Sequence, residues 1–576
     1  DREEERYQSD LAAWKEEQAR IRLGIQLLKV SQEAYCKNAT CREGIPYRAW
    51  LATNAAFLRA AKMENPGWRL FQLAFVLAHI PTIASRMPEF EGYFREDYDE
   101  DKATLLYMST GGGKSEAFFG ILIFTLFFDR LRGKHRGISA MIHYPLRLLT
   151  LQQAQRLMRL LARAEMIRRA MKADGAPFEI GFWVGSSNTP NHVTDGDDSS
   201  QIKSTVQDIP LWSDVPIHGE AKLLDDNPGY GGRNEAWNKL PKCPFCDGEH
   251  PTVLRIIPEQ QHRLGILCAN PKCDWNHTHH GQAHPEPLPF ILVDADIYRR
   301  APSILLGTID KLALIGNHPS TIDKVAGMFG MSRIIDPKNG LLFSPHAEDF
   351  AKAKGKGRLP VAPAVAGGQE VFLDPFPSLI IQDEMHLLEE SLGTFGGLFE
   401  TTLFTWFKEL AKLLDKRACR IPGSSSPRMP KIIAATATIS DPDRQIDALY
   451  QRKVVRFPHP GPQAYRTFYG LPASFETKEA QVERPVGPEV SPRQEEANAP
   501  WARVYVSMLT NGRPHTATTV TVLSAFAVNV TYYLRALTGS SLQARADAIT
   551  DLLSRLSDTP LRDRHRRVIE KYRDHH

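Results

Sequence analysis

The stretch that decides the fold is Ala103-Thr-Leu-Leu-Tyr-Met-Ser-Thr-Gly-Gly-Gly-Lys-Ser115, where an apolar run of strand length meets a glycine-rich turn. Such a turn exposes backbone N–H groups to phosphate at the N-terminus of the next helix. Lys114 would then reach the β- and γ-phosphates of a nucleotide, and the Ser115 hydroxyl would ligate Mg²⁺. Met108 stands where the usual pattern has its first glycine. We expect ATP to contact the loop residues Thr110, Gly111, Gly112, Gly113, Lys114, Ser115 and Glu116.

A second motif, Asp383-Glu-Met-His386, follows another apolar run of strand length at residues 378–382. Taken alone, a Gly-Gly-Gly-Lys run also occurs in flexible turns, and Asp-Glu pairs also occur at helix starts. Here each motif follows a predicted strand, and the glycine-rich motif precedes the acidic one in the sequence. This combination favours a nucleotide-binding site. The second motif is then its magnesium-and-water site.

Strands and helices alternate along the chain from residue 103 onward. This alternation is typical of an α/β fold with a parallel sheet. The carboxyl ends of parallel strands meet at one edge, so residues that follow these strands should lie together there. The expected strands are residues 103–108, 137–144, 179–184, 303–307, 378–382 and 431–435, with helices over residues 114–129 and 146–172.

Four of the seven cysteines form two close pairs, Cys243 with Cys246 and Cys268 with Cys273. Four thiolates in this arrangement suit a closed tetrahedral Zn²⁺ site, which would be structural because catalysis needs an open coordination position. The alternative is four unrelated cysteines of a reducing cytosol. If one cysteine is not a ligand, His277, His279 and His280 are spare candidates.

The chain of 576 residues has a net charge of only +4, so affinity for nucleic acid must come from local basic patches. Basic side chains greatly outnumber acidic ones over residues 131–172, which include Arg147, Arg156 and Arg159. A solvated basic face without a ligand is the alternative. The loop with Lys354 and Lys356 is a second candidate for contact with nucleic acid. The alternative is that this loop is disordered and solvated.

The charged start of the chain shows no signal-peptide pattern, and its longest apolar run is too short for a membrane span. We therefore expect a cytoplasmic protein without a membrane partner.

The motifs resemble those of the first motor domain of superfamily 2 helicases, in the correct order. Residues 109–115 are similar to motif I, 145–150 to motif Ia, 307–311 to motif Ib, 383–386 to motif II and 435–438 to motif III. The resemblance covers residues 69–440 and implies a DExH-type ATPase with a RecA-like parallel sheet flanked by helices.

The resemblance also implies a role for individual residues. Asp383 would hold Mg²⁺ through water, Glu384 would polarise the attacking water, and Lys114 and His386 would complete the catalytic group. Gln72 would read adenine, or be a surface glutamine of an amphipathic helix. Thr436 and Thr438 would couple the nucleotide state to the nucleic acid, which would contact Arg147, Arg156, Arg159, Thr308, Lys311, Lys354 and Lys356.

A narrower resemblance is to the DrmA family, the helicase subunits of bacterial DISARM anti-phage systems. It rests on residues 381–388, 391–394, 71–75 and 457–461, and on the long cysteine-bearing insertion. It implies an ATP-dependent DNA translocase or helicase subunit with a partner resembling DrmB. The alternatives are an ATP- and DNA-binding scaffold with little turnover, and an RNA helicase.

The expected organisation has three parts. Residues 1–68 form a helical N-terminal region, residues 69–456 the first motor domain, and residues 457–576 a linker with an accessory or further domain. The motor would be interrupted by a zinc-ribbon-like insertion at 186–300 and a basic-loop insertion at 317–377. A second motor domain with its Gln-x-x-Gly-Arg-x-x-Arg motif is not evident.

Overall fold

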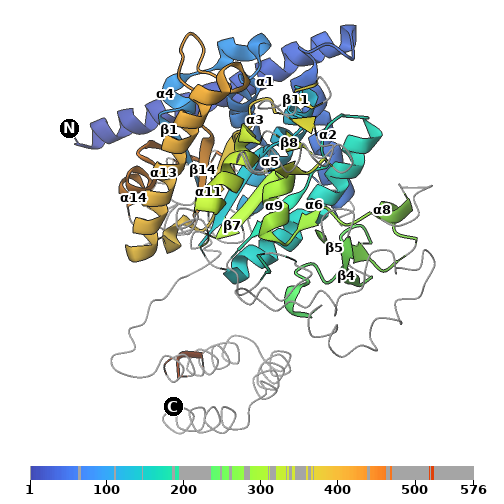
Figure 1. Cartoon of the computed structure of the whole chain (residues 1–576). Coiled ribbons are helices and arrows are strands. Elements are labelled where there is room, and N and C mark those ends of the chain that lie inside the picture. Colours follow the sequence, from blue (N-terminus) through green and yellow to red (C-terminus); the bar gives the residue numbers. More distant parts are fainter. Residues whose placement is uncertain are drawn as a thin grey trace, which may run out of the picture. The chain divides into compact units, whose positions relative to one another are not determined.

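The structure, a computed structural model, divides into two compact units, Asp1–Leu471 and Pro472–His576 (Figure 1). Nearly all described residues belong to the first unit. They are residues 2–61, 67–108, 112–145, 147–184, 235–246, 250–257, 263–270, 272–277, 286–308, 319–332, 372–388, 390–436 and 441–461, with short pieces elsewhere, among them residues 518 and 521–523 of the second unit.

The centre of the first unit is an eight-stranded sheet whose strands are all parallel. Helices cover both of its faces, which confirms the predicted RecA-like α/β fold (Figure 1). In spatial order the strands are β15 (Lys453–Phe457), β1 (Lys102–Tyr107), β14 (Lys431–Thr436), β13 (Leu379–Gln382), β2 (Ala140–Tyr144), β7 (Ile304–Thr308), β3 (Ile180–Trp183) and β6 (Phe290–Ile291).

The central strands are buried on both faces, so they read as continuous apolar runs rather than alternating ones. Their register aligns their carboxyl ends. Tyr107 at the end of β1 is paired with Thr436, and Gln382 at the end of β13 is paired with both Ala434 and His143. The residues that follow these strands therefore lie along one edge of the sheet.

Part of the predicted 186–300 insertion belongs to the main sheet. β6 pairs with β3, with Ile180 opposite Phe290, and helix α9 (Asp294–Arg300) follows it. A strand of two residues is too short to produce a periodic pattern, so β6 could not be predicted from the sequence. The rest of the described insertion contains an antiparallel hairpin, β4 (Thr252–Ile257) and β5 (Arg263–Cys268), and the short helix α8 (Asp274–His277).

The predicted 317–377 insertion contains helix α11 (Pro319–Ala326), the helical turn η7 (Gly327–Met331) and two small antiparallel sheets. Lys354 and Lys356 lie outside the described residues. The strands of the small sheets are β8 (Ile334–Ile335), β9 (Leu342–Phe343), β10 (Leu359–Pro360), β11 (Val365–Ala366) and β12 (Gln369–Glu370).

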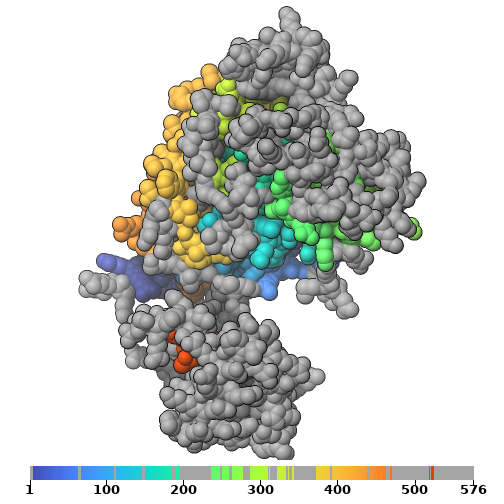
Figure 2. All heavy atoms as spheres, turned by 60° about the horizontal axis from the view of Figure 1, so that its bottom comes forward, coloured from blue at the N-terminus to red at the C-terminus, as the bar shows by residue number. Residues whose placement is uncertain are grey.

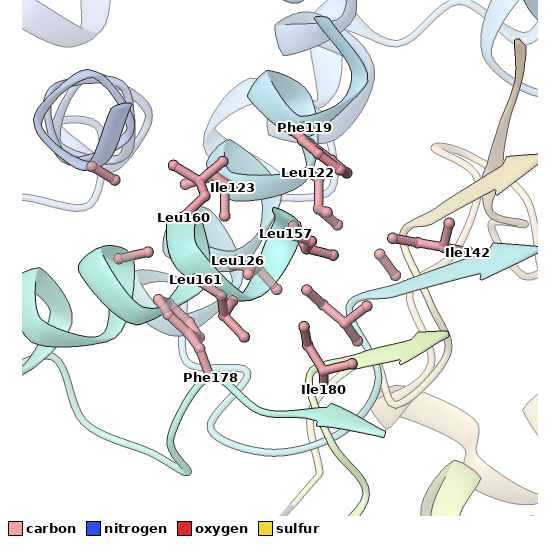
Figure 3. Packing of buried hydrophobic residues seen from close by; sticks show 14 of the residues in the cluster. Phe119, Leu122, Ile123, Leu126, Ile142, Leu157, Leu160, Leu161, Phe178 and Ile180 are labelled. Atoms are coloured by element: carbon pink, nitrogen blue, oxygen red, sulfur yellow. The ribbon is translucent and has the colours of Figure 1, made fainter. Parts of the chain in front are cut away.

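On one face, helix α5 (Lys114–Leu131) is apolar around nearly its whole circumference. It can be so because helices α2 (Ile45–Ala60), α3 (Leu70–Ala84) and α6 (Arg147–Ala170) pack against it, so no side of it faces water. Figure 3 shows its side chains interleaved with those of α6 and of the strands below. Within the described part of the chain, no helix combines the length and the apolar character that crossing a bilayer would require.

The predicted N-terminal helical region packs directly on this face. Helix α1 (Arg2–Lys37) crosses α3 so closely that a Cβ atom on Gly24 would lie 1.9 Å from the carbonyl oxygen of Leu77. Only glycine permits this approach. Residues 1–68 are therefore part of the first unit's core and not a separate body.

The opposite face is covered by α9, by α13 (Glu390–Leu414) and by α14 (Pro442–Tyr450). Phe407 of α13 and Ile380 of β13 share one apolar cluster there, and Ile446 of α14 and Ile432 of β14 share another. Both layers hold the sheet rigid beneath its carboxyl edge.

A buried network of charges lies near the amino ends of β2 and β13, away from that edge. Asp374 accepts hydrogen bonds from Arg86 at 3.0 Å and from Arg132 at 2.7 Å. Burial by itself would raise the pKa of the Asp374 carboxyl, but Arg86 and Arg132 outweigh it and hold that pKa below its usual range. Arg132 also binds Asp129 at 2.8 Å.

We predict that Asp374→Asn lowers the free energy of unfolding of this unit by about 3–5 kcal/mol, because it leaves the buried Arg86 without a carboxylate partner and Arg132 with Asp129 alone. Asparagine tolerates the left-handed backbone of this position, where φ is 48°. Chemical denaturation at pH 7 measures the change. Asp97→Asn, which breaks an exposed pair with Arg95, is the control and should cost less than about 1 kcal/mol.

The pH dependence of this difference has a defined sign. The pKa of Asp374 is lower in the folded than in the unfolded protein, so its stabilisation is complete above the unfolded pKa of about 4. The difference between wild type and Asp374→Asn should therefore shrink as the pH falls below about 4. A difference that is constant with pH would contradict the ion-pair explanation.

Candidate active site and cysteine cluster

The phosphate-loop motif lies at the carboxyl end of β1 and opens α5, as predicted. Gly113 precedes the helix with φ of 92°, in the left-handed region that favours glycine. A Cβ atom there would lie 2.7 Å from Nε2 of Gln72. The loop therefore needs glycine at this position for both conformation and space. Ser109, Thr110 and Gly111 lie outside the described residues.

Gln72 is buried, not a surface glutamine, and holds the loop. Its Nε2 donates to the carbonyl oxygen of Gly113 at 3.0 Å, and its Oε1 accepts from the backbone N–H of Arg69 at 2.9 Å. Arg69 itself donates to the carbonyl oxygen of Gly112 at 2.6 Å. Arg69 was not among the predicted site residues. Its place at the start of α3, three residues before Gln72, was the available signal.

Lys114 is buried at the start of α5, and its Nζ donates to the carbonyl oxygen of Met108 at 2.8 Å. Burial lowers its pKa, while the charges of Glu384 and Asp383 act in the opposite direction. The ammonium group thus faces the acidic motif, as a phosphate-binding lysine opposite a magnesium site should.

Asp383 directly follows β13 and is almost fully buried. Its Oδ1 accepts a hydrogen bond from the backbone N–H of Glu384 at 2.9 Å. Glu384 has a left-handed backbone conformation with φ of 49°. Burial, and then the charge of Glu384, raise the pKa of Asp383 to about 7, against the opposing effect of Lys114. Two carboxylates in a buried place with too little positive charge are a donor set that suits Mg²⁺.

His386 connects the acidic motif to the end of β14. Its Nδ1 lies 3.4 Å from Oε2 of Glu384 and 3.3 Å from Oγ1 of the buried Thr436. The structure thus brings together Glu384, His386 and Thr436, which are far apart in sequence. Thr438 lies outside the described residues.

Two glutamines that position this motif were missed at the sequence level. Gln445 of α14 donates to the carbonyl oxygens of Met385 at 3.0 Å and Leu388 at 2.6 Å. Gln382 donates to the carbonyl oxygen of Asp383 at 2.9 Å. A polar side chain next to the apolar face of α14 is a weak signal, because its partners are backbone atoms that no pattern reveals.

The predicted nucleic-acid residues are not all free to bind phosphate. Arg156 forms an ion pair with Glu116 of the first turn of α5, and the charge of Asp383 acts on it. Lys311 pairs with the buried Asp294 at 2.5 Å. Thr308 ends β7 and is buried, Arg159 is exposed on α6, and Arg147 begins α6 with its side chain outside the described residues.

The four predicted cysteines converge, with all Sγ atoms within 4.8 Å of one another. Cys243 lies 3.7 Å from Cys273 and Cys246 lies 3.8 Å from Cys268 between sulfur atoms. A tetrahedral Zn²⁺ with Zn–S bonds of about 2.3 Å places its sulfurs about 3.8 Å apart. The residues therefore fit a closed zinc site. Hydrogen bonds from Cys268 and Cys273 lower the pKa of the Cys243 thiol to about 5, whereas the pKa values of the other three thiols are raised.

We name the described residues 235–277 the zinc module. Helix α6 anchors it: Arg169 stacks on the ring of Trp275 at 4.0 Å, and Gln155 donates to the carbonyl oxygen of Lys239 at 3.0 Å. The surfaces of α6 and of the zinc module adjoin in the space-filling view (Figure 2). Part of the basic charge of α6 is thus used to hold the module, since Arg163 also reaches the carbonyl oxygen of Phe245 at 3.4 Å.

The amino-acid sequence of this chain was compared with protein-family models and with curated proteins. No family model matches the chain. A curated relative, the DISARM protein DrmA of Bacillus paralicheniformis, is 29% identical over 431 residues, which cover 71% of this chain and 32% of the relative. The chain therefore spans about a third of the length of that protein. The expected resemblance to DrmA is confirmed.

Proposed function

We propose that this chain is the first motor of an ATP-dependent DNA translocase or helicase subunit in a bacterial anti-phage defence complex. The observation that carries the proposal is the carboxyl edge of the sheet, where the charges of Asp383 and Glu384, which follow β13, act on Lys114, which follows β1. Strand β14 pairs with both β1 and β13 and holds their ends in register. The similarity to a DISARM protein supports the defence role. A cytoplasmic location and a protein partner resembling DrmB belong to the same proposal.

In this proposal the residues divide the work as follows. Lys114 binds the β- and γ-phosphates, and Ser115 and Asp383 hold Mg²⁺, which neutralises charge on the phosphates when it is bound. Glu384 takes a proton from the attacking water. Gln72 fixes the loop through Gly113, and an adenine ring would have to reach it there.

Coupling would run through the contacts of Glu384 with His386 and of His386 with Thr436. A change at the water-activating carboxylate would reach the end of β14 through this imidazole. The ion pair of Glu116 with Arg156 would similarly connect the phosphate loop to α6, the helix that Arg147 opens.

We predict that Lys114→Ala abolishes binding of Mg-ATP, because it removes the cation that faces the phosphates. Glu384→Gln should instead retain binding, since Asp383 and Lys114 remain, and reduce hydrolysis at least about a hundredfold through loss of the base. Titration calorimetry measures binding. A phosphate-release assay on the full-length protein with DNA measures turnover.

The same pair of variants tests the second candidate function, an ATP- and DNA-binding scaffold. Normal turnover in Glu384→Gln would refute the motor assignment of this residue. A wild-type full-length protein that binds ATP without DNA-stimulated turnover would favour the scaffold, and stimulation by RNA alone would favour an RNA helicase.

The zinc module is proposed to hold one structural Zn²⁺ on Cys243, Cys246, Cys268 and Cys273. We predict that Cys243→Ser loses the metal and increases amide hydrogen exchange in β4 and β5, while ATP binding persists. Elemental analysis and exchange measured by mass spectrometry are the readouts. Cys36→Ser, at an exposed free cysteine, should keep both metal and protection. A zinc-free wild type with a protected hairpin would contradict the assignment.

For DNA, we predict that Arg159 contributes more to phosphate binding than Arg156 does. Arg159→Gln should reduce the log–log salt slope of DNA affinity by about 0.7–0.9, the release expected for one phosphate. Arg156→Gln should change the slope less, because Glu116 already neutralises that side chain. Fluorescence anisotropy at several salt concentrations measures both slopes. Equal losses in the two variants would show that the ion pair opens on DNA.

A further inference from the structure

A cavity of about 380 Å³ opens on the side of the sheet where the strands begin, away from the nucleotide edge. Its walls come from the end of α3, the C-terminal end of α5 and the segments before β13 and after α13. Ser378 and Ser139, which precede β13 and β2, mark this edge, whereas Asp383 and Tyr144 mark the other. The cavity is therefore separate from the proposed ATP site.

Its lining is strongly cationic. Six basic side chains line it, against only two carboxylates, Glu91 and Asp374. An enclosed group of like charges raises the energy of the empty protein, and an anion in the cavity would offset that cost. The six are Arg42, Arg86, Arg132, Lys416, Arg417 and Arg420.

The floor of the cavity, together with the buried Asp129 and Lys134 that lie outside its lining, holds more cations than carboxylates. Asp374 is shared by Arg86 and Arg132 through the same oxygen, Oδ2. Asp129 is shared by Arg132, at 2.8 Å, and Lys134, at 3.6 Å. Three buried cations thus face two carboxylates.

Among the described residues, no acidic side chain pairs with the rim residues Lys416 and Arg417, whereas Arg42 of the same lining pairs with Glu89. Lys416 is exposed and Arg417 is half-buried on the turn η9 (Asp415–Arg417). The Arg417 guanidinium donates a 3.4 Å hydrogen bond to the carbonyl oxygen of Leu414. Such a bond orients a guanidinium group without neutralising its charge.

We propose that this cavity, the basic pocket, binds a phosphate-bearing ligand up to the size of a nucleotide. Guanidinium groups match the geometry of phosphate oxygens and form two parallel hydrogen bonds with them. The volume falls within the range of about 300–1,000 Å³ that is usual for small-molecule sites. The proposal does not depend on the proposed motor function, because it uses none of the residues of the nucleotide edge.

The test uses inorganic pyrophosphate as the probe, in EDTA, with the Lys114→Ala protein as background so that the phosphate loop does not contribute. We expect calorimetry to detect one site there. Adding Lys416→Glu and Arg417→Glu should weaken that site at least tenfold, because two rim cations become anions. Lys416→Glu alone should weaken pyrophosphate binding severalfold. Because Lys416 is exposed, this single variant should fold normally and keeps the test valid if the double variant misfolds.

The matched control is Lys29→Glu, which makes the same charge change at an exposed lysine of α1 outside the pocket lining. It should leave pyrophosphate affinity unchanged. Absence of binding in the Lys114→Ala background, or equal losses in Lys416→Glu and Lys29→Glu, would overturn the proposal. A single-stranded oligothymidine that displaces pyrophosphate would assign the pocket to nucleic-acid phosphates. Failure to displace it would assign the pocket to a free small anion.

Discussion

The hydrogen-bonded register of four parallel strands, β1, β14, β13 and β2, is the constraint on which the rest of the site depends. Parallel pairing aligns carboxyl ends, so whatever follows each strand meets at one edge. The alignment of Tyr107 with Thr436 and of Gln382 with His143 puts the phosphate-loop motif, the acidic motif and Thr436 together. Apolar layers on both faces then prevent the strands from sliding, because a shifted register would bring polar side chains into the core.

The two edges of the sheet carry opposite electrostatic excesses. At the carboxyl edge, the buried Asp383 and the half-buried Glu384 outnumber the nearby Lys114, and the pKa of Asp383 is raised to about 7, so the edge favours a cation. At the amino edge, Arg86, Arg132 and Lys134 outnumber Asp129 and Asp374. Buried charge that its own protein does not balance is expensive, and for that reason it marks places where a ligand can be bound.

Helix α6 shows how tertiary contacts change the meaning of a basic segment. The sequence predicted a helix that grips nucleic acid with its arginines. In the structure Arg156 pairs with Glu116, and Arg163 and Arg169 hold the zinc module. The helix therefore connects three parts of the molecule, namely the phosphate loop, the start of motif Ia and the zinc module. Arg159 is exposed, so the nucleic-acid contact that composition predicted remains a proposal for this side chain.

The sequence by itself determined the α/β class, most of the strands, the two nucleotide motifs and the four cysteines, because each of these is encoded by residues that are close together in the chain. Periodicity and spacing are local properties. Only the tertiary structure decided that β6 joins the main sheet, that Gln72 and Gln445 hold the two motifs through backbone carbonyls, and that Arg156 and Lys311 are paired. Those contacts join residues tens or hundreds of positions apart, and their partners are backbone atoms or single side chains. No local pattern records them, since they exist only after the chain has packed.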